Sequence, residues 1–171
     1  IKREEYFHFP QINIRLGGSE MIMKGNIRGK NHYEIAVDIQ NLELSNLYSI
    51  IGKSYRVNGL LKSATINIEK SNDQLKPNPK LFTHIEIENG NIDDIQFDTL
   101  KITVIYRNRR FLLKDFKLDI FSENINGDGW FNIGLSNEGG FFQDEDQLYL
   151  NFNCKNVDIE RFNRYLPWGY E

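Results

Sequence analysis

Histidine is the first residue type in this chain whose chemistry needs testing, because imidazole can bind a metal or act as a general base near neutral pH. The three histidines, His8, His32 and His84, are scattered along the sequence. His84 falls on the polar side of a predicted strand, and the sequence contains no nucleophile elbow that suggests a Ser/His/Asp set. We therefore expect exposed or hydrogen-bonded histidines rather than metal ligands or catalytic groups.

A second candidate is the segment 124–129 (Asn-Ile-Asn-Gly-Asp-Gly), which resembles the start of a calcium-binding loop. Such a loop requires a glutamate at its twelfth position, and Leu135 stands there instead. The Gly-x-Gly pattern is better explained by a strand that opens after a turn. The sequence therefore predicts no metal site in this segment.

The carboxylates form no recognisable pair for acid–base catalysis. Asp93 and Asp94 are typical of turn residues before a strand, and the acidic run 144–146 is typical of a solvated loop. Nothing singles out the two acids that glycoside hydrolysis would need. We therefore predict that the protein is not an enzyme and needs no cofactor.

The segment 107–110 (Arg-Asn-Arg-Arg) is basic and lies between two predicted strands, at the tip of a hairpin. It is either a charged turn or a contact for anionic headgroups or an acidic partner. The net charge of the chain is −3, and its aromatic residues lack basic neighbours on the same face. Nucleic-acid binding, which favours a basic surface, is therefore not expected.

Cys154 is the single cysteine, so the chain can form neither an internal disulfide nor a four-thiolate zinc site. It occupies an apolar position of a predicted strand, which predicts a buried and unreactive thiol. No apolar run reaches the ~20 residues that a membrane-spanning helix needs.

The elements that position these residues are predicted mainly as strands. In seven segments apolar and polar residues alternate with a period of two, which is typical of a strand with one apolar and one wet face. Ile105 is an exception within its segment. The residues expected on the apolar face are Ile35, Val37, Ile39, Ile66, Ile68, Ile85, Ile87, Leu100, Ile102, Val104, Phe116, Leu118, Ile120, Phe131, Ile133, Leu148, Leu150 and Phe152.

Turns are predicted where glycine follows asparagine or another glycine. Segments 70–80 and 136–146 are the most loop-like. Helical spacing is confined to Leu42–Ile51 and Val157–Leu166, each predicted as a turn or short helix at the end of a strand. The predicted turns are Gly17–Gly18, Asn58–Gly59, Asn89–Gly90, Asn126–Gly127 and Gly139–Gly140.

This pattern leaves many strands with an apolar face and no long amphipathic helix to cover it. Two arrangements solve the problem. The strands can form two sheets that pack as a sandwich. Alternatively, one sheet can curl on itself and leave an elongated apolar groove for a ligand. Periodicity alone favours the sandwich and does not exclude the groove.

Two segments that lie 115 residues apart have the same pattern. Residues 35–47 and 150–162 match at each apolar position, and Asn41 is equivalent to Asn156. An internal repeat favours an extendable structure over a closed globule. We interpret residues 1–171 as one segment of a longer repetitive protein, in which the repeat unit restarts near residue 148.

The order of these segments resembles that of AsmA-like proteins, and most of all the translocation and assembly module family, TamB. The resemblance covers nearly the whole chain from Met21 onward. It implies an all-β, elongated, curled sheet shaped like a taco, with an apolar interior, very little helix and no catalytic residues. The segments that carry it are 35–47, 57–61 (Val-Asn-Gly-Leu-Leu), 85–89, the strand pair within 100–120, 127–131 (Gly-Asp-Gly-Trp-Phe) and the restart at 148.

Members of this family are tethered in the inner membrane of bacteria with two membranes, cross the periplasm and meet an outer-membrane barrel protein. The resemblance implies that this chain is a periplasmic, lipid-conducting segment whose apolar face shields phospholipid acyl chains between the membranes. The alternative is a scaffold or chaperone module for outer-membrane protein assembly that acts through strand pairing. We also expect the exposed sheet edges to let the segment dimerise.

Overall fold

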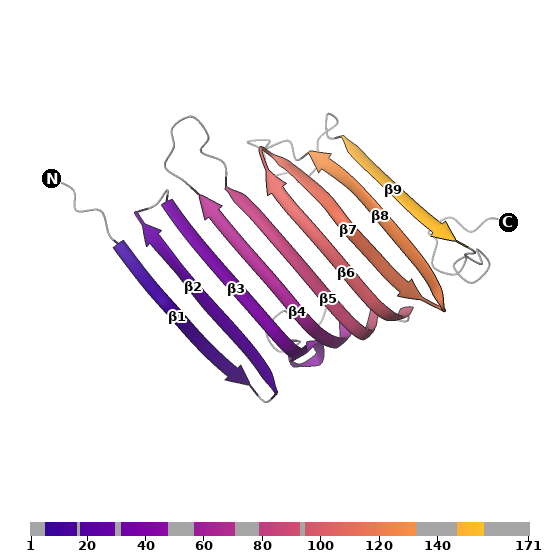
Figure 1. Ribbon diagram of the computed structural model, residues 1–171, viewed down its shortest axis with the longest axis horizontal. Coiled ribbons are helices and arrows are strands. Elements are labelled where there is room, and N and C mark those ends of the chain that lie inside the picture. The colour runs from indigo at the N-terminus through magenta and orange to yellow at the C-terminus, as the bar shows by residue number, and fades with distance from the viewer. Residues whose placement is uncertain are drawn as a thin grey trace.

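The structure is a computed structural model that describes residues 6–16, 18–29, 32–47, 57–70, 79–92, 95–132 and 147–155. These residues form nine strands and one short 3-10 helix, η1 (Leu44–Leu47), which follows the third strand (Figure 1). The strands are β1 (Tyr6–Leu16), β2 (Ser19–Arg28), β3 (His32–Glu43), β4 (Val57–Lys70), β5 (Lys80–Ile92), β6 (Ile95–Arg107), β7 (Arg110–Ile120), β8 (Glu123–Asn132) and β9 (Leu148–Lys155).

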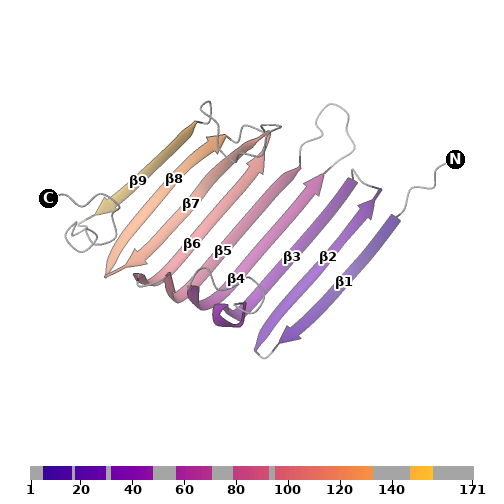
Figure 2. The same ribbon diagram turned by 180° about the vertical axis from the view of Figure 1, so that it is seen from behind.

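All nine described strands belong to one antiparallel sheet, and their order across the sheet is their order along the chain (Figures 1 and 2). Each strand therefore pairs only with its neighbours in the sequence, as in a continuous meander. The predicted all-β fold with one elongated, curled sheet is confirmed. The sandwich alternative is wrong for the described part of the chain, which contains no second sheet.

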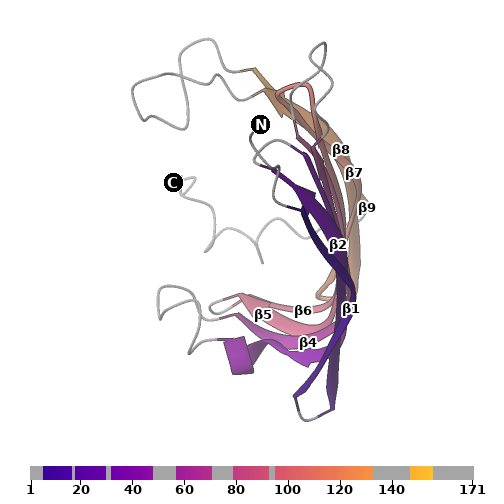
Figure 3. The same cartoon turned by 90° about the vertical axis from the view of Figure 1, so that its left-hand side faces the viewer.

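The sheet is curved, and in profile it is open on one side (Figure 3). Its strongest bend lies where β4, β5 and β6 turn inward near η1. Register shifts mark bulges or irregularities in the pairings β1–β2, β4–β5, β6–β7 and β7–β8. Because a bulge adds an unpaired residue that bends a strand and increases its twist, these sites supply curvature that lets one sheet surround a space.

The main cluster of buried apolar residues lies inside this bend. Leu42, Leu61 and Ala64 are buried and form the centre of the cluster, and Leu44 of η1 packs against them. Because η1 lies on the inner side of the curve (Figure 3), the apolar face of the sheet is its concave face. The position of η1 agrees with the short helix that was predicted between Leu42 and Ile51.

Three asparagine–glycine pairs that were predicted as turns lie instead inside strands, at 58–59 in β4, 89–90 in β5 and 126–127 in β8. The prediction that a strand opens at Gly127 and Gly129 was also wrong, because β8 already begins at Glu123. Strands β1 and β2 were not predicted, since Pro10 and Gly25 interrupt their alternation. The pair Gly139–Gly140 and the segment 157–166 lie outside the described residues.

The glycines inside strands allow an aromatic ring from the next strand to lie directly on the backbone. Phe9 lies over Gly25, Phe97 over Gly90 and Phe152 over Gly127. A Cβ atom at any of these glycines would overlap the ring that covers it. Glycine therefore serves cross-strand packing at these positions rather than a turn.

Gly25→Ala tests this packing. The added methyl group would overlap the carbonyl oxygen of Glu34 and lie 2.9 Å from Cζ of Phe9. We expect the free energy of unfolding to fall by about 1–3 kcal/mol, as for other overpacked sites, measured by urea denaturation. Gly18→Ala is the control, because a Cβ there meets nothing within 4 Å. An equal effect of the two substitutions would contradict the packing role.

Candidate functional site

The pairing register places apolar side chains from all nine described strands on the concave face. Since directly paired residues share a face of the sheet, each row of partners can be followed from β1 to β9. One row near the middle of the sheet is Ile12, Met23, Val37, Ile66, Thr83, Val104, Leu113, Gly129 and Leu150. A neighbouring row is Phe9, Gly25, Ile35, Ile68, Leu81, Tyr106, Phe111, Phe131 and Leu148.

The residues that the sequence predicted on the apolar face lie together on this face wherever they are described. Their alternation within each strand and their register between strands give the same result. Ile133 lies outside the described residues. Ile120 is on the same face but only 1% exposed, so it supports the sheet and offers no surface for contact.

Most of the concave face is only half-buried. Among the described residues, the buried hydrophobic side chains are Leu42, Leu61, Ala64, Phe97 and Ile120. At the strand spacing of about 4.8 Å, the eight intervals between nine strands give a path of roughly 38 Å. The described part of the molecule therefore has a long apolar face without a layer that seals it.

Aromatic rings strengthen one end of this face. Tyr106, Phe111 and Phe131 form a ladder across three strands, with ring centroids 4.6 and 4.7 Å apart. Phe116 and Phe152 meet edge to face at 5.5 Å. These pairs line the face with apolar surface and add cross-strand stability beyond area burial. Phe111 was not among the residues predicted on the apolar face, although the register gives it the same position as Phe131.

The opposite, convex face carries the polar network. Lys62 and Glu88 form an ion pair at 2.5 Å, and Lys101 and Glu86 form another at 2.8 Å. The hydrogen bond from Lys101 is the main cause that lowers the pKa of Glu86 below 4.5, against a smaller opposing effect of burial. The convex face carries these ion pairs, and between β5 and β9 it also carries one apolar row. That row consists of Phe82, Ile105, Leu112, Trp130 and Tyr149.

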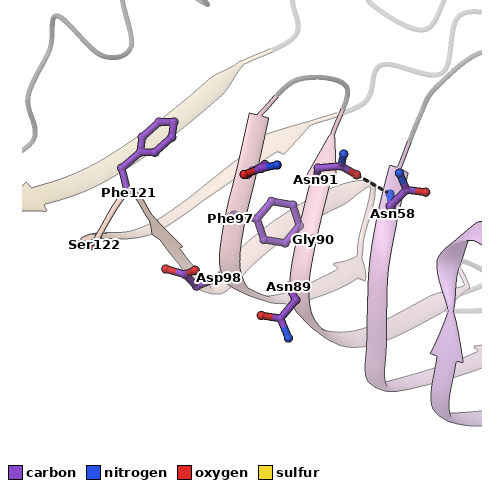
Figure 4. Close-up of a pocket in the computed structure, with 9 residues that line it drawn as sticks. Asn58, Asn89, Gly90, Asn91, Phe97, Asp98, Phe121 and Ser122 are labelled. Atoms are coloured by element: carbon purple, nitrogen blue, oxygen red, sulfur yellow. Dashed lines mark hydrogen bonds between the residues drawn. The ribbon is translucent and has the colours of Figure 1, made fainter.

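Two open hollows were not predicted. The first, at the curled end, has a volume of about 500 Å³ and lies beside Asn58, Asn91 and the ring of Phe97 (Figure 4). There the backbone N–H of Asn58 donates to Oδ1 of Asn91 at 3.0 Å. The second, about 850 Å³, is bordered by Lys101 and Lys114. The second hollow also contains His84 and Thr103, whose Nδ1 and Oγ1 atoms lie 2.9 Å apart.

The described histidines do not assemble into a centre. His84 lies on the polar side of β5, as expected, with Nδ1 2.9 Å from Oγ1 of Thr103. Nδ1 of His8 is 2.5 Å from Oδ1 of Asn26. Within the described ranges, no group of three or more His, Cys, Asp or Glu side chains is placed to hold a metal ion. The calcium-like segment 124–129 is part of strand β8 rather than a loop.

Cys154 corrects one prediction. Its thiol is free and exposed, whereas its apolar position had predicted a buried one. The prediction was wrong because β9 is the last strand of the described sheet, and no described strand covers its outer side.

The basic segment 107–110 forms the predicted hairpin tip between β6 and β7. Asn108 and Arg109 have φ values of 52° and 61°, which suit the tight two-residue turn. The guanidinium carbon of Arg110 lies 4.7 Å from the ring centre of Trp130 on the convex face, which is a cation–π contact. The acidic pair 93–94 and the acidic run 144–146 lie outside the described residues.

Comparison with known proteins yields no match to a family model, a curated protein or a solved structure. Within the described residues, no helix has the length and apolar character needed to cross a membrane. The geometry of the concave face is therefore the evidence on which a function must rest.

Lys101→Met tests the ion pair that lowers the pKa of Glu86. A carboxylate with a lowered pKa in the folded state adds stability above its unfolded pKa, near 4.5, and this stability is lost as the pH falls through the folded value. We expect Lys101→Met to reduce the difference in unfolding free energy between pH 7 and pH 3 by less than about 1 kcal/mol, because the pair is partly exposed.

Urea denaturation at both pH values measures this difference. Lys114→Met is the control, since Lys114 forms no ion pair within the described residues. If both variants show the pH dependence of the unchanged protein, the pair does not contribute.

Proposed function

We propose that the concave face of this sheet binds the acyl chains of phospholipids and lets them move along it while their headgroups remain in water. The observation that carries the proposal is the half-buried apolar face, which runs through all nine described strands and has no covering layer among the described residues. An exposed apolar face of this extent is costly in water unless something binds to it.

The hydrophobic effect gives the scale of what such a face can do. Each methylene group of an acyl chain costs ~0.8 kcal/mol in water, so a chain of ~16 carbons faces a barrier on the order of 10 kcal/mol. A continuous apolar surface lowers this barrier because the chain stays covered along its path. Thr83 is a rare polar member of the central rows, so the face offers few fixed hydrogen-bonding anchors that would hold one lipid in place.

The wet face complements this role. Its cross-strand ion pairs and hydrogen bonds, such as that from Oγ1 of Thr65 to Asp38 at 2.9 Å, keep the convex side in contact with water. The ion pairs thus lie on the opposite side of the sheet from the apolar rows that run through all nine described strands. That separation suits a conduit in which headgroups and acyl chains need different surroundings.

In the setting that the resemblance to TamB implies, the segment would lie in the periplasm, within a parent protein anchored in the inner membrane. Its phospholipid would pass toward an outer-membrane barrel partner. The curled sheet and its apolar concave face support this proposal.

Val104→Arg and Ile105→Arg form a matched test, because these neighbours in β6 belong to opposite faces. Val104 lies in the central apolar row, whereas Ile105 lies on the convex face. A guanidinium among acyl chains would be buried without a partner, at a cost of several kcal/mol. We expect Val104→Arg to reduce co-purified phospholipid by roughly tenfold or more, and Ile105→Arg to leave it nearly unchanged.

Native mass spectrometry and lipid extraction of the purified protein measure the bound lipid, and circular dichroism checks that each variant keeps its sheet. A lipid-free unchanged protein, or an equal loss in both folded variants, would contradict the proposal. If Val104→Arg unfolds the protein, the milder, uncharged substitution Val104→Asn is compared with Ile105→Asn in the same way.

A further inference from the structure

The two edge strands of the described sheet, β1 and β9, differ in how they limit further pairing. β1 contains Pro10, which has no N–H to donate, and a bulge between Phe9 and Ile12. Both features are typical protections of an edge strand. β9 pairs with β8 in one unbroken register and contains no proline. Its outer edge is therefore the less protected one.

The backbone of β9 presents hydrogen-bonding groups along this edge. A Cβ at Gly129 would overlap the carbonyl oxygen of Tyr149, so that carbonyl points toward β8. Because backbone groups alternate in direction along an antiparallel strand, those of Leu150 and Phe152 point outward. The side chains are also accessible, with Leu148 66% and Phe152 47% exposed.

The structure also repeats itself around this edge. In β1, Phe9 pairs with Gly25 and a bulge follows; in β7, Leu113 pairs with Gly129 and a bulge follows. Leu113 follows Phe9 by 104 residues, and Gly129 follows Gly25 by the same number. Ile35 of β3 then pairs with Gly25, as Leu150 of β9 pairs with Gly129. Strands β7–β9 thus reproduce the geometry of β1–β3.

In the first of these units, the edge equivalent to the open side of β9 is already occupied. β4 covers the outer side of β3, and Ile35, Val37 and Ile39 pair there with Ile68, Ile66 and Ala64. The direction of the backbone groups agrees as well, since a Cβ at Gly25 would overlap the carbonyl oxygen of Glu34, the equivalent of Tyr149. The β3–β4 interface is therefore a template for what fits on β9.

We propose that the outer edge of β9 binds an extended, antiparallel strand with the pattern of β4. That strand has apolar residues opposite Leu150 and Phe152 and a small residue opposite Cys154. By the β3–β4 template, these partners correspond to Ile68, Ile66 and Ala64, respectively. Such a strand would cover the exposed thiol and continue the concave apolar face.

A synthetic peptide with the sequence of residues 57–70 tests the proposal on the unchanged protein. Its binding is measured by fluorescence anisotropy of a label at its N-terminus. In the template register, the N–H of Ile66 would bond to β9, whereas the N–H of Asn67 would point away. We expect N-methylation of Ile66 to abolish binding and N-methylation of Asn67 to leave it within about threefold.

The native thiol reports the register. A peptide carrying Ala64→Cys, supplied as its 2-thiopyridyl disulfide, should exchange with the Cys154 thiolate and release pyridine-2-thione roughly tenfold faster than the same derivative of a Thr65→Cys peptide. The Thr65→Cys sulfur would lie on the opposite face, whereas binding raises the local concentration of the Ala64→Cys disulfide at Cys154. Equal rates, no binding, or equal effects of the two N-methyl groups would overturn the proposal. So would a dimer joined through β9 that the peptide cannot displace.

This proposal does not depend on lipid transport. Strand binding with a lipid-free concave face would refute the proposed function alone, and lipid binding without strand binding would refute this inference alone.

Discussion

The structure depends on one constraint, which is that a single antiparallel sheet has to accommodate the side chains on both of its faces. Hydrogen bonds between neighbouring strands satisfy the backbone, but they do nothing for the side chains above and below it. One face is wet and carries ion pairs such as Lys101–Glu86. The other is apolar, and only its curled end is packed, around Leu42 and Leu61. Curvature, stability and the proposed function all follow from how the rest of that face is accommodated.

Curvature is the part of the answer that the chain supplies itself. The bulge after Leu113 interrupts the regular pairing of β7 with β8 and bends the strand. Gly90 lets the ring of Phe97 lie directly on the backbone of the neighbouring strand. Bending the sheet brings apolar side chains of distant strands nearer to one another and reduces the exposure of each. It does not bury them, because the curve remains open in profile (Figure 3). The sheet is thus only partly self-covering, and the apolar surface that stays exposed is what a ligand could still remove from water.

Much of this arrangement could be predicted from the sequence, and the reason is physical. A strand's period of two is a local property, so Val37, Ile66 and Val104 could be assigned to one face without knowing their partners. The choice between one sheet and two is not local, and periodicity alone left it open. The role of Gly90 was missed because the sequence Asn-Gly is the same whether it forms a turn or lies within a strand beneath an aromatic ring. Cys154 was assigned to the core because its own strand is apolar, whereas its exposure depends on what lies beyond β9.

A sheet of this kind separates the residues that maintain the fold from those that could bind a ligand. In a globular domain, both tasks fall on the core, so a charge placed among its apolar residues unfolds the protein. Here the fold rests on backbone ladders between sequence neighbours, on ring-over-glycine packing and on the buried cluster around Leu42 and Leu61. Val104 and its row can consequently contact a ligand without being the main source of stability. In the proposed function, the same separation would let weak, uniform binding along the face coexist with a well-defined structure. An apolar surface with few fixed polar anchors would not hold an acyl chain at any one strand.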